Sequence, residues 1–243
     1  MTLVGRALAA TLSSFLAAVA LASDRPYLAT TSAVADEDDD NVIALESWIE
    51  AARRFGDFRF EPEYNFDPRN AVRVELGISQ DRRFDPEVRS RGAEVEYKHL
   101  FTDLARSGYG TGVIVGVDWD DHSGPIEGLA NAAGHTWSLG VVGLTTLRPT
   151  PDTLLHLNLG AGIESGEGAR VRWAVAVEHE IVSRTMLFAE AGTAGEQRLI
   201  HGGMRHWVKR DRFAVDLTVG RRYGEPIDST FITIGIALQD IYW

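Results

Sequence analysis

Residues Thr153 to Gly192 read TLLHLNLGAGIESGEGARVRWAVAVEHEIVSRTMLFAEAG. In the first part of this stretch Leu155 and Leu157 alternate with His156 and Asn158, and two further runs continue the alternation after short interruptions. A period of two residues places successive side chains on opposite faces of a β-strand. Consecutive strands joined by such short breaks predict antiparallel hairpins.

Similar alternation covers most of the chain. It recurs at residues 58–66, 72–79, 93–101, 109–119, 137–141, 200–208, 213–220 and 232–238. Together these segments give about eleven strands. Residues 41–54 fit a helix, from the spacing of Leu45 and Trp48, or a strand in which Leu45 and Ile49 share a face. Because single-chain bacterial outer-membrane barrels have even numbers of strands, we interpret this segment as a strand and predict an all-β, antiparallel transmembrane β-barrel of about 12 strands.

The predicted connections alternate in length, as expected when both termini of a barrel lie on the periplasmic side. The longer, outer connections are at residues 81–90, 120–134, 165–169 and 224–229. The shorter, inner ones are at residues 67–69, 149–152, 183–184 and 209–212. The inner connection at 102–107 and the outer break near Glu196 depart from this rule.

The first part of the chain is predicted to precede the barrel. Residues 1–22 have a positively charged start, an apolar run and the cleavage pattern Ala20-Leu21-Ala22. These features indicate a secretory signal peptide rather than a membrane anchor, because the run is shorter than the roughly 20 residues a bilayer requires. Residues 23–41 are small, polar and acidic, and we interpret them as a disordered, solvated linker, with a weak calcium-binding tail as the alternative. The barrel is then predicted for residues 42–243.

The composition excludes several classes of function. The formal net charge is -11 and the chain has no basic cluster, so nucleic-acid binding is not expected. Cysteine is absent, which excludes disulfides, thiolate metal sites and a lipid anchor on an N-terminal cysteine. The mean hydropathy of -0.11 is compatible with a β-barrel, whose strands are apolar on alternate residues only. No cofactor is expected.

The two faces of the predicted strands differ in chemistry. Aromatic residues such as Tyr97, Trp119 and Trp173 fall on the apolar face, whereas the other face is rich in glycine, glutamate and arginine. Charges of this kind suit a polar lumen better than a protein core, so we expect the apolar face to contact lipid in the bacterial outer membrane. A soluble secreted β-protein with its polar face in water is the alternative. The residues predicted to line the lumen are Glu61, Glu63, Arg73, Glu75, Glu94, Glu96, Lys98, Asp118, His156, Asn158, Arg172, Glu178, Glu180, Glu190, Arg205 and Asp216.

These lumen charges allow two interpretations. Either they pair into a lattice that fills the barrel, or they line a water-filled path that selects solutes. The first predicts a non-transporting structural or surface-interaction barrel, and the second a channel or passive transporter for small solutes. The excess of glutamate predicts a preference for cations if a path exists. We expect a monomer whose partners are outer-membrane lipid, lipopolysaccharide, the barrel-assembly machinery and a small-molecule solute.

Several short motifs resemble a known family. They are Leu155-His156-Leu157-Asn158-Leu159-Gly160, Ala189-Glu190, Gly203-Met204-Arg205, Val215-Asp216-Leu217 and Ile234-Gly235-Ile236. Together they make the chain from Arg59 onward similar to the outer-membrane transporter family of the phenol-degradation meta-pathway. The resemblance implies a channel-type barrel in a Gram-negative outer membrane and uptake of hydrophobic or aromatic compounds.

The sequence does not predict an enzyme. A catalytic site needs a nucleophile, a base and an orienting group at one depth, yet no G-x-S-x-G motif occurs. His156, His201 and Ser138 share the polar face, but no spacing links them. The histidines on the apolar face are His99, His179 and His206.

No metal site is predicted either. Strand geometry directs His179 away from Glu178 and Glu180. Asp118, Asp120, Asp121 and His122 are assigned to the longest outer loop, and we interpret them as solvated rather than as calcium ligands.

The C-terminal residues break the strand phase. The apolar face that contains Ile234 and Ile236 continues to Tyr242 instead of the terminal Trp243, and Asp240 interrupts it. Either a bulge shifts the phase near Gln239 or the last residues leave the barrel.

Overall fold

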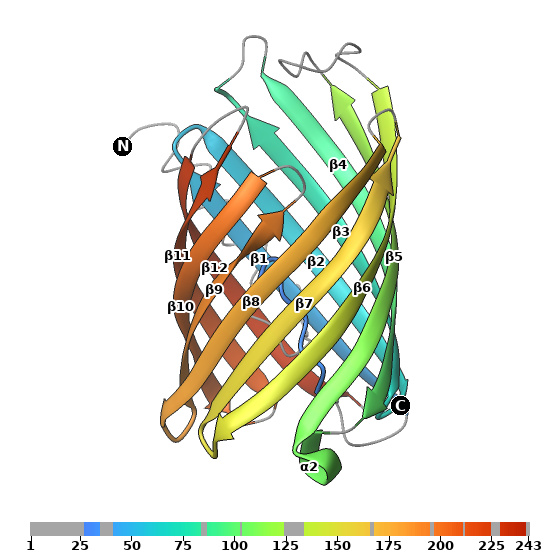
Figure 1. The fold of residues 1–243 in the computed structure, drawn as a ribbon. Helices are drawn as coiled ribbons and strands as arrows, with labels where there is room; N and C mark the ends of the chain where they lie inside the picture. Colours follow the sequence, from blue (N-terminus) through green and yellow to red (C-terminus); the bar gives the residue numbers. More distant parts are fainter. Residues whose placement is uncertain are drawn as a thin grey trace, which may run out of the picture.

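The computed structural model is a closed barrel of twelve antiparallel strands, in which consecutive strands pair and β12 returns to β1 (Figure 1). The structure describes residues 27–34, 41–83, 87–102, 104–123, 134–165, 168–194, 197–210, 212–224 and 229–241. The strands are β1 (Val42–Ala52), β2 (Phe55–Asp67), β3 (Asn70–Asp81), β4 (Val88–Thr102), β5 (Tyr109–Ser123), β6 (Gly134–Thr150), β7 (Thr153–Glu164), β8 (Gly168–Val182), β9 (Thr185–Ala194), β10 (Gln197–Lys209), β11 (Phe213–Tyr223) and β12 (Ser229–Ile241). The predicted fold is confirmed, and residues 42–52 form a strand rather than a helix.

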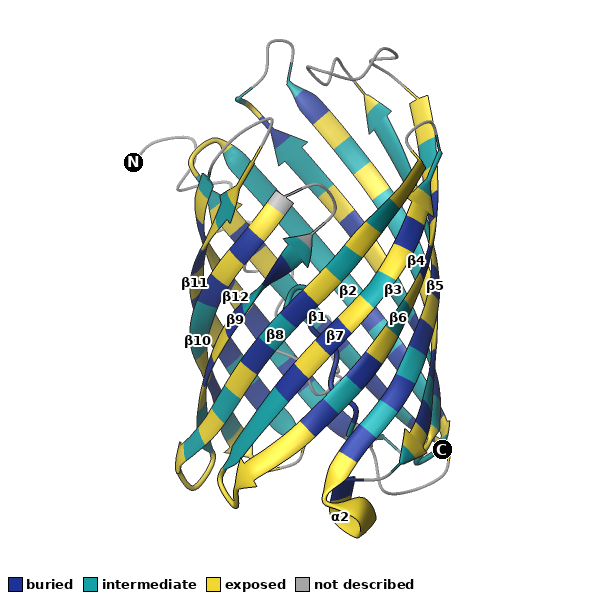
Figure 2. Ribbon diagram, viewed as in Figure 1, coloured by how far each residue is buried: buried dark blue, intermediate teal, exposed yellow. Residues whose placement is uncertain are grey.

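The outer face of the barrel is apolar. Leu159 and Val171 are 67% and 68% exposed, whereas their inward-facing neighbours are covered, so the strands in Figure 2 are banded by burial. The aromatic residues Tyr97, Trp119 and Trp173 are exposed on the same face. An apolar exterior around a charged interior is the reverse of a soluble protein and is the arrangement of a transmembrane barrel.

The two ends of the barrel carry different connections. The upper end in Figure 1 carries the β3–β4 and β5–β6 connections, while the lower end carries the tight turns at 151–152 and 183–184. The lower β4–β5 connection contains the short helix α2 (Leu104–Ser107). Within the described ranges, no helix is long and apolar enough to cross a membrane. Because the longer connections of outer-membrane barrels are extracellular, we take the upper end as the outer one.

One predicted loop is partly strand. β5 continues to Ser123, so Asp120 to His122 belong to β5 and not to the predicted outer loop at 120–134. On this extension Asp121 pairs with Arg91 at 2.7 Å and with His135 at 3.1 Å. A strand that extends beyond the lipid has water on both faces, so the apolar alternation that reveals strands in the sequence is lost there.

A bulge explains the C-terminal phase. Ile43 on β1 pairs with Ile241, but Leu45 pairs with Leu238, so β12 contains one extra residue between these two pairs. Gln239 faces the interior and is 8% exposed. The bulge near Gln239, the first of the two predicted alternatives, is confirmed. Residues 242–243 lie outside the described part of the chain.

Residues 27–34 lie inside the barrel. Figure 1 shows them in dark blue between the strands of the front and back walls, and Thr30 and Ala33 are 0% exposed. The structure therefore corrects the predicted solvated linker at 23–41 for these residues. The remainder of that linker up to residue 40, and the predicted signal peptide at 1–22, lie outside the described residues.

Candidate functional site

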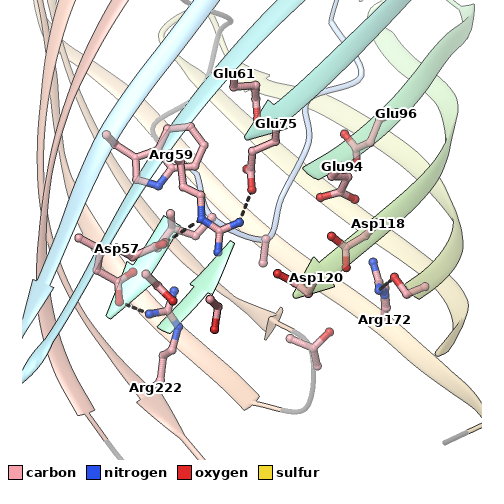
Figure 3. Close-up of a pocket in the computed structure, with 18 of the residues that line it drawn as sticks. Asp57, Arg59, Glu61, Glu75, Glu94, Glu96, Asp118, Asp120, Arg172 and Arg222 are labelled. Atoms are coloured by element: carbon pink, nitrogen blue, oxygen red, sulfur yellow. Dashed lines mark hydrogen bonds and ion pairs between the residues drawn. The ribbon is translucent and has the colours of Figure 1, made fainter. Parts of the chain in front are cut away.

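The upper part of the lumen contains a cavity of about 600 Å³, part of whose lining is drawn in Figure 3. It extends to Ser90 and His122 near the outer end, and Leu28, Ala29 and Thr31 of the internal segment line its lower part. Its acidic lining residues are Glu50, Asp57, Glu61, Glu75, Asp81, Glu94, Glu96, Asp118, Asp120 and Glu164. Its basic lining residues are Arg59, Arg73, Arg83, Arg172 and Arg222. The charged part of the lining is thus predominantly acidic.

Carboxylates hold the arginines of β2 and β3 against the lining of the cavity. Arg59 donates from Nε to Asp57 at 2.8 Å and from Nη1 to Glu75. Arg73 donates from Nε to Glu96 at 2.9 Å. Charge-assisted hydrogen bonds of this kind fix the positions of the guanidinium groups.

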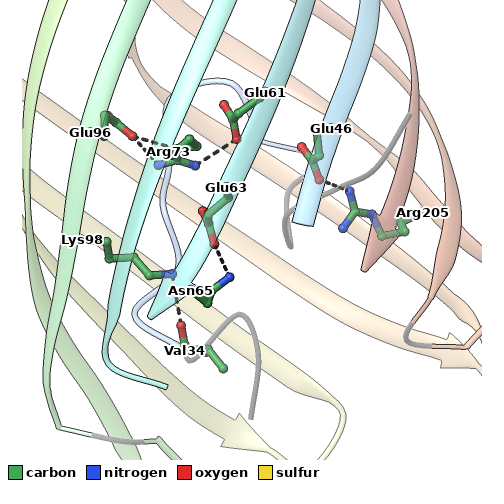
Figure 4. Close-up of polar contacts among 9 residues, drawn as sticks. All are labelled: Val34, Glu46, Glu61, Glu63, Asn65, Arg73, Glu96, Lys98 and Arg205. Atoms are coloured by element: carbon green, nitrogen blue, oxygen red, sulfur yellow. Dashed lines mark hydrogen bonds and ion pairs between the residues drawn. The ribbon is translucent and has the colours of Figure 1, made fainter. Parts of the chain in front are cut away.

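Two further ion pairs reach across β12 and connect β11 or β10 to β1. Arg205 donates from Nε and Nη2 to Asp216 at 2.8 Å and from Nη2 to Glu46 at 2.9 Å. Figure 4 shows Arg205 and Glu46 meeting inside the barrel. Nearer the outer end, Arg222 pairs with Glu50. Both contacts join strands on opposite sides of the seam where the barrel closes.

Three carboxylates face the cavity without such a partner. Among the described residues, Glu94, Asp118 and Asp120 form no ion pair and no side-chain hydrogen bond. Arg172 lies near Asp118 in Figure 3 and donates to Ser138 at 3.4 Å. A cleft lined mainly by one sign of charge concentrates ions of the opposite sign, so this wall favours cations.

Below the cavity, the barrel wall binds the main chain of the internal segment. The amide groups of Leu28 and Ala29 donate to the two oxygens of Glu190 at 2.9 and 3.0 Å. The Thr31 amide donates to Asn158 Oδ1 at 2.6 Å, and Asn158 Nδ2 donates back to the Thr31 carbonyl at 2.9 Å. One side chain on β9 and one on β7 therefore satisfy four main-chain groups of the segment.

The two ends of the segment are also attached. At one end, the Tyr27 hydroxyl donates to Glu178, and the Tyr27 ring packs edge-on against Phe188 with 5.4 Å between centroids. At the other, Lys98 Nζ donates to the Val34 carbonyl at 3.4 Å (Figure 4). Inward-facing side chains of the four strands β4, β7, β8 and β9 thus hold a segment that precedes the barrel in sequence.

Apolar side chains cover one side of the segment at Ala33. Leu100, Ile114 and Leu144, from β4, β5 and β6, are all buried and pack with Ala33. The Ala33 amide donates to Thr146 Oγ1 at 2.8 Å. The segment thus packs directly against the β4–β6 side of the lumen.

The predicted lumen residues fall at three levels of the structure. Those that line the cavity are Glu61, Arg73, Glu75, Glu94, Glu96, Asp118, Asn158 and Arg172. Those that contact the internal segment, residues 27–34, are Lys98, His156, Asn158, Glu178 and Glu190. Those buried in the lower lumen are Glu63, Arg205 and Asp216.

Glu180 is an exception among the predicted lumen residues. It lies near the end of β8, where it pairs with Arg210 of the β10–β11 turn at 3.0 Å. Its side chain is 37% exposed at the lower rim. Strand parity gives the face on which a residue lies but not its height along the barrel axis. The sequence therefore predicted Glu180 to line the lumen, although it lies at the rim.

Sequence reasoning missed Glu46, Glu50 and Arg222, which belong to ion pairs inside the barrel. The two glutamates alternate with Leu45 and Ile49 in β1, so the polar parity of that strand was a signal for them. Arg222 lies close to the upper end of β11, where the alternation fades.

Among the described residues, neither His156 nor His201 bonds to Ser138, the serine that shares the polar face with them. His156 bonds Thr146 at 2.9 Å and His201 approaches Glu190 at 3.1 Å, while Ser138 contacts Arg172. His99, His179 and His206 lie on the outer face, each bonded at its Nδ1 to a polar side chain of the preceding strand: Asn70, Thr153 and Thr185.

One serine and one histidine do meet at the outer end of the cavity. Ser90 Oγ lies 2.8 Å from His122 Nδ1, a contact that the sequence did not reveal. Within the described residues, no carboxylate bonds the other ring nitrogen of His122, so the orienting member of a triad is not in place. In the same part of the chain, no group of three or more histidine, aspartate or glutamate side chains is arranged to hold a metal ion.

Similar solved structures are found for this fold. The KdgM porin matches over 82% of this chain and 99% of its own, with 10% sequence identity and a TM-score of 0.59. The β domain of the Bordetella autotransporter BrkA matches over 84% and 100%, with 11% identity and a TM-score of 0.52. The chain has the fold of outer-membrane β-barrels.

The sequence itself gives no such match. No protein-family model matches the chain, and no curated protein matches it. The resemblance to the phenol-degradation transporter family therefore stays a prediction, while the barrel fold that it implied is present.

Proposed function

We propose that this protein is a channel in the bacterial outer membrane for small polar solutes, with a preference for cations. The observation that carries the proposal is the acidic cavity of about 600 Å³ within a closed barrel. Carboxylates of β4 and β5 that have no ion pair among the described residues, Glu94, Asp118 and Asp120, face this space. Rings and walls of carboxylates select cations in pores, because they replace part of the hydration of the ion and repel anions.

We infer the class of solute from the charge of the cavity lining and not from the similar solved structures. One matching structure is described as the KdgM porin with disordered oligogalacturonate, and a chain of acidic sugars is a poor match for a cavity rich in carboxylates. Uptake of aromatic compounds, implied by the family resemblance, is compatible with small aromatic cations. We therefore expect small cationic solutes to pass more readily than anionic ones of equal size.

Reversal potentials in planar bilayers test the channel. Under a potassium chloride gradient, open channels of this protein should show cation selectivity. The triple variant Glu94→Gln, Asp118→Asn, Asp120→Asn should lower the cation-to-anion permeability ratio several-fold, since it removes the carboxylates that lack ion pairs and leaves Arg172 in place. Ser79→Ala, which alters the cavity lining near the outer end without a change of charge, is the control.

A second function is supported by the segment inside the barrel. Because residues 27–34 fill the lower lumen, a non-transporting structural barrel is the alternative. Absence of conductance from both the wild-type protein and a variant that lacks residues 27–34 would establish that alternative. Anion-selective conductance would overturn the proposed preference for cations.

A further inference from the structure

We propose that the inner wall formed by β6 to β9 is a binding site for a peptide main chain, and that residues 27–34 are its built-in ligand. This inference rests on the proposed channel function, because it makes the segment a reversible plug that closes the lumen. The site lies below the acidic cavity and shares Asn158 with its lining.

The contacts identify the main chain as the recognised group. Glu190 accepts from the amides of two consecutive residues, Leu28 and Ala29, as an anion does at a turn of main-chain N–H groups. Asn158 binds both the amide and the carbonyl of Thr31, which is the pairing that a neighbouring strand would otherwise supply. Side chains of the wall thus take the place of a strand partner for a peptide that cannot join the closed sheet.

The side chains of the segment contribute less to specificity. Thr30 is fully buried, yet its hydroxyl has no hydrogen-bond partner among the described residues. Tyr27 is the main exception, because its ring lies between His156 and Phe188 and its hydroxyl reaches Glu178. The site therefore selects a peptide with small residues and one aromatic anchor.

Gly110 on β5 leaves space for residues 27–34. A Cβ atom at residue 110 would lie 1.9 Å from the carbonyl oxygen of Ala33, and the three heavy atoms nearest to it all belong to Ala33. A side chain at this position consequently conflicts first with the segment.

Each contact between residues 27–34 and the barrel wall is weak enough for the segment to be released. Hydrogen bonds that replace bonds to water contribute only about 0.5–1.5 kcal/mol each. The bonds to Asn158 and Thr146 are of this kind, the two bonds to the Glu190 carboxylate contribute about 1.5–3 kcal/mol each, and the apolar contact at Ala33 involves one small side chain. The loss of one or two such contacts moves the bound-to-released ratio about tenfold, because 1.4 kcal/mol corresponds to a factor of ten.

Cysteine labelling tests occupancy of the site without any measurement of transport. The chain has no cysteine, so Thr30→Cys introduces a single thiol at a buried position whose hydroxyl has no partner. In folded protein this thiol should resist a maleimide reagent. Addition of Gly110→Leu should accelerate labelling at least about tenfold, since the leucine occupies the place of the Ala33 carbonyl.

The matched control is Gly143→Leu, which adds the same side chain to the outer face of the neighbouring strand β6. It should leave the labelling rate unchanged while the barrel keeps its heat-modifiable migration on gels. Rapid labelling of Thr30→Cys in the otherwise wild-type protein would overturn the proposal, as would equal rates with leucine at residues 110 and 143.

Conductance measures the consequence for transport. Deletion of residues 27–34 should raise single-channel conductance several-fold over wild type. The synthetic peptide YLATTSAV, added at millimolar concentration to the deletion variant, should restore the block. Glu190→Gln together with Asn158→Leu should weaken the effect of the peptide.

The outcomes separate the two proposals. If the wild-type protein and the deletion variant conduct equally, the plug is refuted and the channel stands. If neither conducts but Thr30→Cys labels only in the Gly110→Leu background, the peptide site stands and the channel is refuted.

Discussion

Replacement of Arg205 by alanine is expected to destabilise the barrel by about 3–5 kcal/mol, because removal of one partner of a buried ion pair leaves charge without compensation. Arg205 is 1% exposed and binds Asp216 and Glu46 at the same time. Since Glu46 lies on β1 and Arg205 on β10, the loss should weaken the closing seam in particular. Urea unfolding in lipid vesicles, followed by tryptophan fluorescence, measures the change.

A second variant separates charge from packing. The triple change Arg205→Met, Glu46→Gln, Asp216→Asn removes every charge of the cluster and keeps most of its volume. It should recover most of the lost stability, because a buried ion pair contributes little over a well-packed neutral replacement. A triple variant as unstable as Arg205→Ala would mean that the guanidinium acts by filling space.

Arginine at Val115 is expected to cost about 2–4 kcal/mol, the penalty measured for a cation on the lipid face near the bilayer midplane. Val115 is exposed on the outer face of β5, between the outward-facing Tyr109 and Trp119 near the two ends of the apolar band. The same unfolding experiment in vesicles reports the effect.

Arginine at Asp118 provides the matched comparison on the same strand. Its side chain would enter the cavity beside Glu94 and Asp120, where space and opposite charge are both present. We expect little change in unfolding and a clear loss of cation selectivity. Equal destabilisation by Val115→Arg and Asp118→Arg would contradict the assignment of the inner and outer faces of β5.

Alternation predicted the barrel well wherever lipid contacts one face and the lumen the other. The alternation identified Leu155, Leu157 and Leu159 as outward-facing, because a lipid-facing residue must be apolar and its neighbour need not be. The signal failed where that constraint ends. Asp120 and His122 lie on a strand above the lipid, and the bulge between Leu238 and Ile241 reverses the parity within one strand.

The site was less predictable than the fold. Parity identified Glu94 and Asp118 as inward-facing, but whether a carboxylate meets an arginine depends on strand tilt and on reach across β12, as for Arg205 and Glu46. The internal position of residues 27–34 had almost no signal. A segment bound through its main chain needs no particular side chains, and only Tyr27 distinguishes it from an ordinary polar linker.

Residues 27–34 are joined to β1 through residues 35–41 of the same chain, a connection that spans at most about 25 Å when fully extended. A released segment consequently remains near its site, at an effective concentration of the order of millimolar. A free peptide with a Kd of about 0.1 mM, or about 5.5 kcal/mol of binding, would be a poor inhibitor at micromolar concentration, yet the same peptide tethered in this way is bound about nine-tenths of the time. Closure of the lumen therefore requires proximity more than affinity, and the lifetime of each open state is set by how fast a tethered segment returns.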